Sequence, residues 1–124
     1  METRKQIAVE KKQCGLNCAQ AVLCAYADIA GIDEATAMGL AAPFGAGMGN
    51  MEGTCGAIVG AGLVIGLCGG STRQARQIMN KFQERNGATQ CKLLKGIGTG
   101  KVLRECSDCV ADAAEFLEEQ ISEL

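Results

Sequence analysis

The chain carries eight cysteines in 124 residues, and their thiols are the side chains best suited to chemistry. They are Cys14, Cys18, Cys24, Cys55, Cys68, Cys91, Cys106 and Cys109. Because no export signal is visible, we expect reduced thiols, redox chemistry or a metal site rather than a framework of structural disulfides. The chain has no His, which removes Cys–His nucleophile pairs, mixed Cys/His zinc sites and ordinary haem ligation.

Several cysteines fall at the predicted starts of helices: Cys18, Cys55, Cys91 and the pair Cys106 and Cys109. The unpaired amides and the dipole of a first helical turn favour negative charge, so a thiol there has a lowered pKa and more thiolate. The recurrence predicts that several helix N-termini converge and present their thiols to one place. Such a place would favour thiolates or an anionic metal–sulfur cluster.

We expect the chain to be organised around a glycine-rich loop that leads into an apolar helix. The loop spans residues 45–53, where glycines permit positive φ and close approach of another segment. We expect Thr54 to cap the helix and Cys55 to be its first residue, with the helix running over residues 55–67. This helix is predicted to lie at the centre of the fold.

Glycines recur four residues apart along this central helix, at Gly56 and Gly60 and again at Gly62 and Gly66. This spacing leaves bare strips where another helix can approach closely. Each interior glycine costs about 1 kcal/mol relative to alanine, so tight packing must offset the loss. One helix that could pack against these strips is the same helix of a second copy of the chain, so a homodimer is one expectation.

The remaining sequence reads as further helices and predicts an all-α fold. The expected elements are helices over 3–13, 18–29, 34–42, 72–86 and 107–122, and a short turn over 90–95. Asn17 with Gln20 and Ser71 with Gln74 have the capping-box spacing, and Gly87 suits a helix C-terminus. We therefore expect a single domain over 1–124, a helical bundle of about five or six helices.

Composition excludes several other functions. The net charge of −2 and an aromatic content of 3% do not suit a nucleic-acid-binding surface. The segment over 95–101, KGIGTGK, lacks the spacing of a phosphate-binding loop, so no nucleotide is expected. The charged N-terminus and the short, glycine-rich apolar run over 55–68 predict a cytoplasmic protein that does not enter a membrane.

Local cysteine spacing adds little by itself. Cys106-x-x-Cys109 has the spacing of redox and metal-binding motifs, but it lacks a βαβ context and a second such pair. Cys24 and Cys68 lie in apolar surroundings, and we expect them to fill the core as small hydrophobic residues.

Four sequence segments together resemble the C_GCAxxG_C_C family, small cysteine-rich proteins to which redox activity is ascribed. The segments are GLNCAQAVLCAYAD over 15–28, FGAGMGNMEGTCGAIVGAGLVIGL over 44–67, Cys91-x-x-Leu94 and Cys106-x-x-x-Val110. The resemblance covers about residues 15–117. It implies that the family cysteines are Cys18, Cys55, Cys91 and Cys106, with Cys109 one helical turn beyond the last. A related module accompanies haem in split-Soret cytochromes, but this chain has no CxxCH motif, so haem is not supported.

Three functions remain open from the sequence. The first is dithiol–disulfide exchange or electron transfer with an unidentified redox partner or thiol substrate, using Cys18, Cys55, Cys91 and Cys106 as catalytic residues. In this hypothesis Cys55 attacks and Cys18 resolves the mixed disulfide. The second is an iron–sulfur cluster, Zn or Cu(I) held by the same four cysteines, with Cys109 as the alternative to Cys106. The third is a helical structural or interaction domain with incidental thiols.

Overall fold

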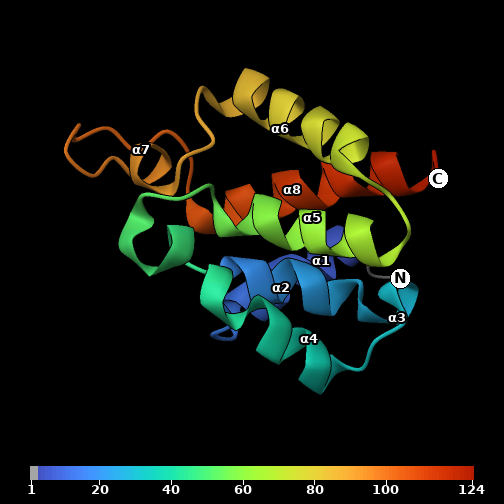
Figure 1. The fold of residues 1–124 in the computed structure, drawn as a ribbon. Helices are drawn as coiled ribbons and strands as arrows, with labels where there is room; N and C mark the ends of the chain where they lie inside the picture. Colours follow the sequence, from blue (N-terminus) through green and yellow to red (C-terminus); the bar gives the residue numbers. More distant parts are fainter. Residues whose placement is uncertain (1–2) are drawn as a thin grey trace.

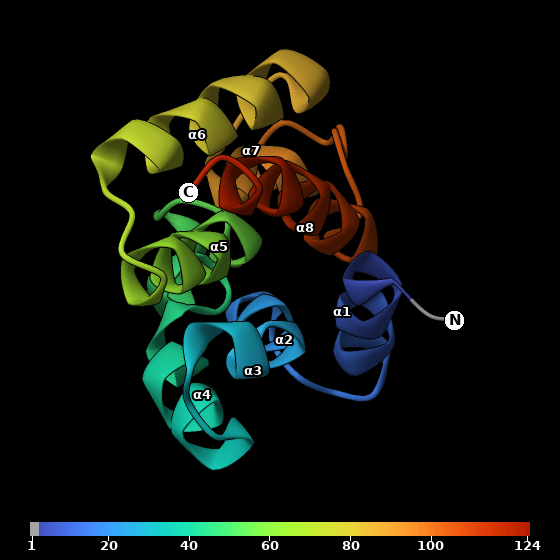
Figure 2. The ribbon, with the colours of Figure 1, turned by 90° about the vertical axis from the view of Figure 1, so that its right-hand side faces the viewer.

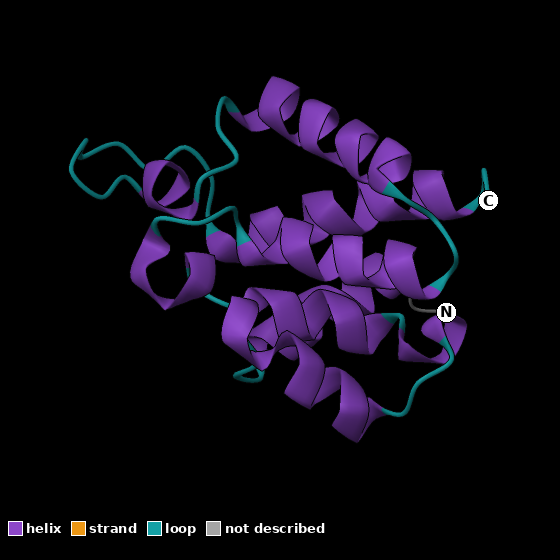
Figure 3. Cartoon of the chain, viewed as in Figure 1, coloured by secondary structure: helices purple, strands orange, loops and turns teal. Residues whose placement is uncertain are grey.

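The computed structural model describes residues 3–124, which form helices and connecting loops without a β-strand (Figures 1 and 3). The helices in chain order are α1 (Arg4–Gln13), α2 (Cys18–Ala25), α3 (Ala27–Ala30), α4 (Glu34–Ala41), α5 (Gly56–Leu67), α6 (Thr72–Asn86), α7 (Cys91–Lys95) and α8 (Cys106–Ile121). Between α4 and α5 lie a 3₁₀ turn, η1 (Ala42–Phe44), and a π-type turn, η2 (Gly47–Met51). The all-α prediction is confirmed.

The expected number of five or six helices is wrong, because the described part of the chain has eight. The helix predicted over 18–29 ends at Ala25 and resumes as the short α3. Tyr26 makes the break: its amide donates to the Leu23 carbonyl at 3.1 Å, and its fully buried hydroxyl donates to the Ala114 carbonyl at 3.2 Å. The segment expected to be a short turn over 90–95 is the helix α7.

Helix α5 packs most extensively on α2 and also contacts α8 and α6. It therefore lies between α2 on one side and α6 and α8 on the other (Figures 1 and 2). A Cβ added at Gly60 would lie 2.7 Å from the Ala19 carbonyl oxygen, and one at Gly56 would lie 2.8 Å from the Phe44 carbonyl oxygen. These two glycines therefore permit the close approach predicted for them. Gly62 and Gly66 face open space.

Several helix ends follow the sequence prediction. Asn17 with Gln20 and Ser71 with Gln74 form capping boxes, in which each side chain accepts from the other residue's amide. Gly87 ends α6 with a left-handed φ of 82°. These capping interactions form within one helical turn, so tertiary packing does not change them.

Two predicted helix starts are displaced by one residue. Helix α5 begins at Gly56 with Cys55 as its N-cap, so Thr54 is not the cap. Thr54 instead forms an isolated antiparallel bridge with Gln90, which holds it in an extended conformation. Helix α8 begins at Cys106 rather than Ser107.

No helix within residues 3–124 combines the length and the apolar character that crossing a membrane requires.

Candidate functional site

Five cysteines line one small cavity at the end of the bundle nearest α7. They are Cys18, Cys55, Cys91, Cys106 and Cys109. Each lies at or within the first turn of a helix, and Figure 1 shows the starts of α2, α5, α7 and α8 at this end of the molecule. The free space amounts to about 10 Å³, room for one water molecule at most. All four cysteines predicted as site residues are thus near one another, together with Cys109.

Backbone pairing between the glycine loop and the start of α7 brings two of these cysteines together. The Cys55 amide donates to the Thr89 carbonyl at 2.8 Å, and the Cys91 amide donates to the Gly53 carbonyl at 3.0 Å. Gly47, with φ of 57°, lies so close that an added Cβ would be 2.8 Å from the Cys91 Cβ. The loop glycines therefore have the predicted role of permitting close approach.

The thiols interact as two pairs, Cys18 with Cys106 and Cys55 with Cys109. In each pair the hydrogen bond lowers the pKa of one thiol, Cys106 or Cys55, and raises the pKa of its partner. Each pairing links residues far apart in sequence, and all four cysteines are free thiols. The sequence hypothesis had Cys18 resolve a disulfide on Cys55, whereas each of these two has a different hydrogen-bonding partner.

The pKa of Cys55 is lowered mainly by the hydrogen bond from the Cys109 thiol, while burial acts in the opposite direction. The amides of Ala57 and Ile58, in the first turn of α5, also favour the thiolate. The helix-start argument thus holds at Cys55, with the cysteine as N-cap.

The pKa of Cys106 is lowered to about 5, first by the hydrogen bond from Cys18 and then, against the effect of burial, by the Lys95 ammonium group. Burial alone would lower the pKa of Lys95, but its interactions with Cys106 and Cys91 outweigh burial and raise that pKa. Cys106 and Lys95 therefore behave as a thiolate–ammonium pair at neutral pH.

The other three cavity thiols favour the protonated form. The pKa of Cys18 is raised by its hydrogen bond to Cys106 and by burial, and that of Cys109 by its hydrogen bond to Cys55 and by burial. Burial likewise raises the pKa of Cys91, and the charges of Cys55 and Cys106 add to this effect, while the Lys95 ammonium group acts in the opposite direction.

Access to the cavity differs sharply among its cysteines. Cys106 is partly exposed, whereas Cys18, Cys55, Cys91 and Cys109 are only 3–8% exposed. An external reagent therefore meets Cys106 first.

The three remaining cysteines lie away from the cavity. Cys24 is buried in the core, as predicted, and Cys68 is partly buried against it. The Cys68 sulfur lies 3.9 Å from the Ile29 carbonyl oxygen. Cys14 is exposed at the end of α1.

The arrangement does not fit a metal ion, although an all-thiol donor set suits thiophilic metals. Within residues 3–124 no three Cys, Asp or Glu side chains are grouped so that they could hold one. The small free volume also leaves no room for an iron–sulfur cluster unless the thiols separate.

The cavity also involves charged residues that the sequence analysis did not single out, namely Lys95 and Arg104 in its wall. Lys95 follows Cys91 by four residues, the spacing of neighbours on one helix face, which is a signal that could have identified it. Arg104 lies in a loop, and no local pattern marks it. Its partner Asp112 follows Cys109 by three residues on α8.

The structure therefore defines an all-helical protein in which cysteines from the starts of four helices line one cavity. A family model described as "Putative redox-active protein (C_GCAxxG_C_C)" matches residues 16–120. The chain therefore belongs to the C_GCAxxG_C_C family, as its motifs predicted. No curated protein and no solved structure matches the chain.

Proposed function

We propose that this protein is a thiol–disulfide redox protein in which Cys106 attacks a partner disulfide and Cys18 resolves the product. The observation that carries the proposal is the pairing of a low-pKa, accessible thiolate with a protonated thiol across the cavity. Such a pair contains both the nucleophile and the second sulfur that dithiol exchange requires. The redox description of the family supports the same class of function.

The exchange transfers two electrons. The Cys106 thiolate forms a bond to one sulfur of the partner disulfide, and the partner's other sulfur leaves with the electron pair. The Cys18 thiol then gives up its proton and attacks the Cys106 sulfur, forming the Cys18–Cys106 disulfide. The second partner sulfur leaves as a thiolate, so the partner is reduced to a dithiol while this protein is oxidised.

Cys55 and Cys109 form a second dithiol of the same kind, deeper in the protein. We assign to them an internal couple that exchanges with the outer pair, because the two pairs share one cavity. Cys91 pairs with Lys95 and is assigned no disulfide.

Trapping of the mixed disulfide tests the proposal. The Cys18→Ser variant, treated with an oxidised model peptide disulfide, is expected to accumulate the peptide on Cys106, which mass spectrometry locates. Cys24→Ser, which removes another buried thiol of α2, is the matched control and should release the peptide as the wild type does.

Labelling of Cys14 alone would contradict the proposal, because that site is merely exposed. Iron, zinc or copper bound stoichiometrically after anaerobic purification, with the cavity thiols protected from labelling, would replace it by the metal-binding alternative.

A further inference from the structure

Residues 91–104, which comprise α7 and the loop leading to α8, carry four basic residues and no acidic one. All 14 acidic residues of the chain lie outside this segment, with 8 of the 12 basic ones, so the rest of the chain has a net charge of −6. We call residues 91–104 the basic lobe. It ends two residues before Cys106, and Figure 1 shows it at the end of the bundle where α8 begins. An acidic protein thus has a local positive charge beside its thiols.

The backbone of the basic lobe is held in one shape. The Leu94 carbonyl accepts from the amides of Leu103 at 3.0 Å and Arg104 at 3.3 Å, which closes the loop onto α7. Gly96 has a left-handed φ of 75°, and a Cβ added there would lie 2.7 Å from the Lys101 carbonyl carbon. The side chains of the loop therefore have fixed positions relative to the cavity.

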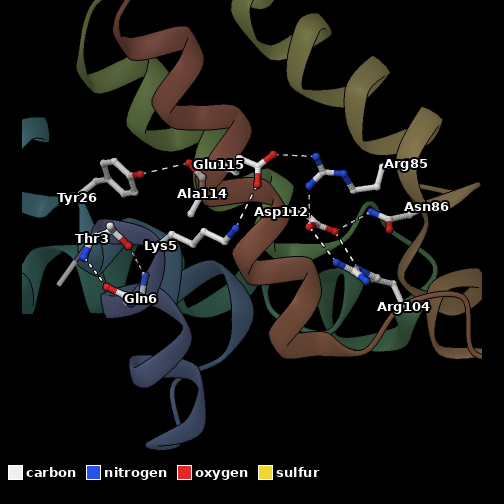
Figure 4. Close-up of polar contacts among 10 residues, drawn as sticks. All are labelled: Thr3, Lys5, Gln6, Tyr26, Arg85, Asn86, Arg104, Asp112, Ala114 and Glu115. Carbon is white, nitrogen blue, oxygen red and sulfur yellow. Dashed lines mark hydrogen bonds and ion pairs between the residues drawn. The ribbon is translucent and has the colours of Figure 1, made fainter.

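Arg104 ties the end of the basic lobe to α8. Asp112 accepts from Arg104 Nε at 3.0 Å and Nη2 at 3.1 Å, and also from Arg85 and Asn86 (Figure 4). The side chain of Asp112 is only 3% exposed. This buried contact neutralises Arg104, so it anchors the lobe rather than presenting a free charge.

The other three cations of the basic lobe differ in what they contact. Lys92 pairs with Glu52 at 3.3 Å, and Lys95 lines the thiol cavity. Lys101 is exposed and forms no ion pair with a carboxylate within residues 3–124. Lys101 is therefore the cation that a carboxylate from another molecule can bind.

The basic lobe also exposes large apolar side chains. Within residues 3–124, nine large hydrophobic side chains are exposed, and four of them, each 38–52% exposed, belong to the lobe: Leu93, Ile97, Val102 and Leu103. None of the four packs on the hydrophobic core of the described residues. Leu93 and Leu103 line a hollow of about 320 Å³ together with Lys101. A hollow with apolar walls and one cation suits a segment that offers an apolar side chain next to a carboxylate.

We propose that the basic lobe is the docking surface for the redox partner, and that it selects polypeptide segments with acidic and apolar side chains beside their disulfide. The inference rests on the proposed redox function and names the class of its substrate. The partner's carboxylate binds Lys101, its apolar side chain fills the hollow, and its disulfide lies against the partly exposed Cys106. Glu105 and Asp108, both exposed at the start of α8, disfavour acidic groups there, so the acidic contact lies on the Lys101 side.

Two oxidised model peptides test the charge selection. Both contain a Cys-x-x-Cys disulfide and leucines, and they differ only in carrying glutamates or lysines beside it. The measured quantity is the rate at which the reduced protein forms the Cys18–Cys106 disulfide, determined by mass spectrometry of quenched samples. At low ionic strength the glutamate peptide should react about tenfold faster, and salt should reduce this ratio. Equal rates, or a faster lysine peptide, would overturn the inference.

Lys101→Glu should slow the reaction with the glutamate peptide by about threefold or more, because it replaces attraction by repulsion. Arg76→Glu is the matched control, since Arg76 is an exposed cation on α6 and the change in net charge is the same. Arg76→Glu should react as the wild type does. Equal slowing in the two variants would show that net charge, and not the basic lobe, sets the rate.

Leu103→Ser tests the apolar part of the docking surface. It should slow the reaction with the glutamate peptide by about threefold. Leu40→Ser is its control, because Leu40 is similarly exposed, at 41%, but lies on α4. Equal rates for the two serine variants would remove the hollow from the docking surface.

Hydroxyethyl disulfide, which is small and uncharged, reports the reactivity of the thiols without docking. Lys101→Glu and Leu103→Ser should react with it at the wild-type rate, and slower reaction would show that they act on the thiols instead. A wild-type protein that reacts with hydroxyethyl disulfide but equally with both peptides refutes the docking surface alone. A wild-type protein that forms no Cys18–Cys106 disulfide with any of these reagents refutes the proposed function itself.

Discussion

At the scale of single residues, neighbouring thiols of the cavity differ in their pKa. Cys106 has a pKa of about 5, while its partner Cys18 has a raised pKa. One sulfur is thus poised as a nucleophile, and the other holds the proton that stabilises it. Two thiols that titrate together in this way act as a unit, so replacing either one changes both.

Lys95 should set much of the reactivity of Cys106. Replacing Lys95 with Met removes the ammonium group that favours the thiolate, and we expect the pKa of Cys106 to rise by about 1 unit. Alkylation of wild-type Cys106 should reach half its maximal rate near pH 5 and remain maximal at neutral pH. In Lys95→Met the curve of alkylation rate against pH should have its midpoint at higher pH, so the alkylation rate at pH 5–6 should fall.

Lys92→Met is the control for this measurement, because Lys92 lies on the same short helix but pairs with Glu52 at 3.3 Å. Its alkylation curve should match that of the wild type. Identical curves for Lys95→Met and the wild type would show that Lys95 does not act on Cys106.

The sequence predicted which cysteines would lie at helix starts, but it did not indicate the charged residues beside them. Cysteines at helix starts could be recognised because a helix start is a local pattern. Arg104 and Asp112 could not be recognised, since their contact depends on the path of a loop over α8. Cys109 was expected only as an alternative to Cys106, whereas both line the cavity.

At the scale of elements, the close packing of α5 on α2 holds Cys18 in place. Gly60 lies against the backbone of Ala19, the residue that follows Cys18. Backbone atoms cannot move aside as a flexible side chain can, so this contact constrains the start of α2.

Gly60→Ala should therefore destabilise the protein by about 1–3 kcal/mol through overpacking. Displacement of Ala19 should also slow formation of the Cys18–Cys106 disulfide. Unfolding in urea measures the first effect, and mass spectrometry of timed oxidation samples measures the second.

Gly62→Ala is the matched control on the same helix, because its added Cβ would meet open space. Higher helix propensity should make this variant up to about 1 kcal/mol more stable. If both alanine variants were equally stable, close packing at Gly60 could not be what positions α2.

Helix boundaries were predictable where a local residue caps the helix. They were less predictable where a backbone contact with a residue far along the chain sets the boundary. Ser71 and Gly87 bound α6 as predicted. The start of α5 was misplaced because Thr54 pairs with Gln90, a residue 36 positions further along the chain. No local pattern reports such a pairing.

At the scale of the whole molecule, the fold gathers cysteines from four helix starts at one end of the bundle (Figure 1). The sequence predicted this convergence as a hypothesis, from the recurrence of cysteines at helix starts. It could not predict which sulfurs would pair, because pairing depends on how α8 lies across α2 and α5.

The disulfide map of the mildly oxidised protein, obtained by mass spectrometry of peptides with all remaining thiols blocked, tests the central claim most directly. We predict two disulfides, Cys18–Cys106 and Cys55–Cys109, with Cys14, Cys24, Cys68 and Cys91 still reduced. Thiols in the cavity that all stay reduced, or that join in other pairs, would contradict the account.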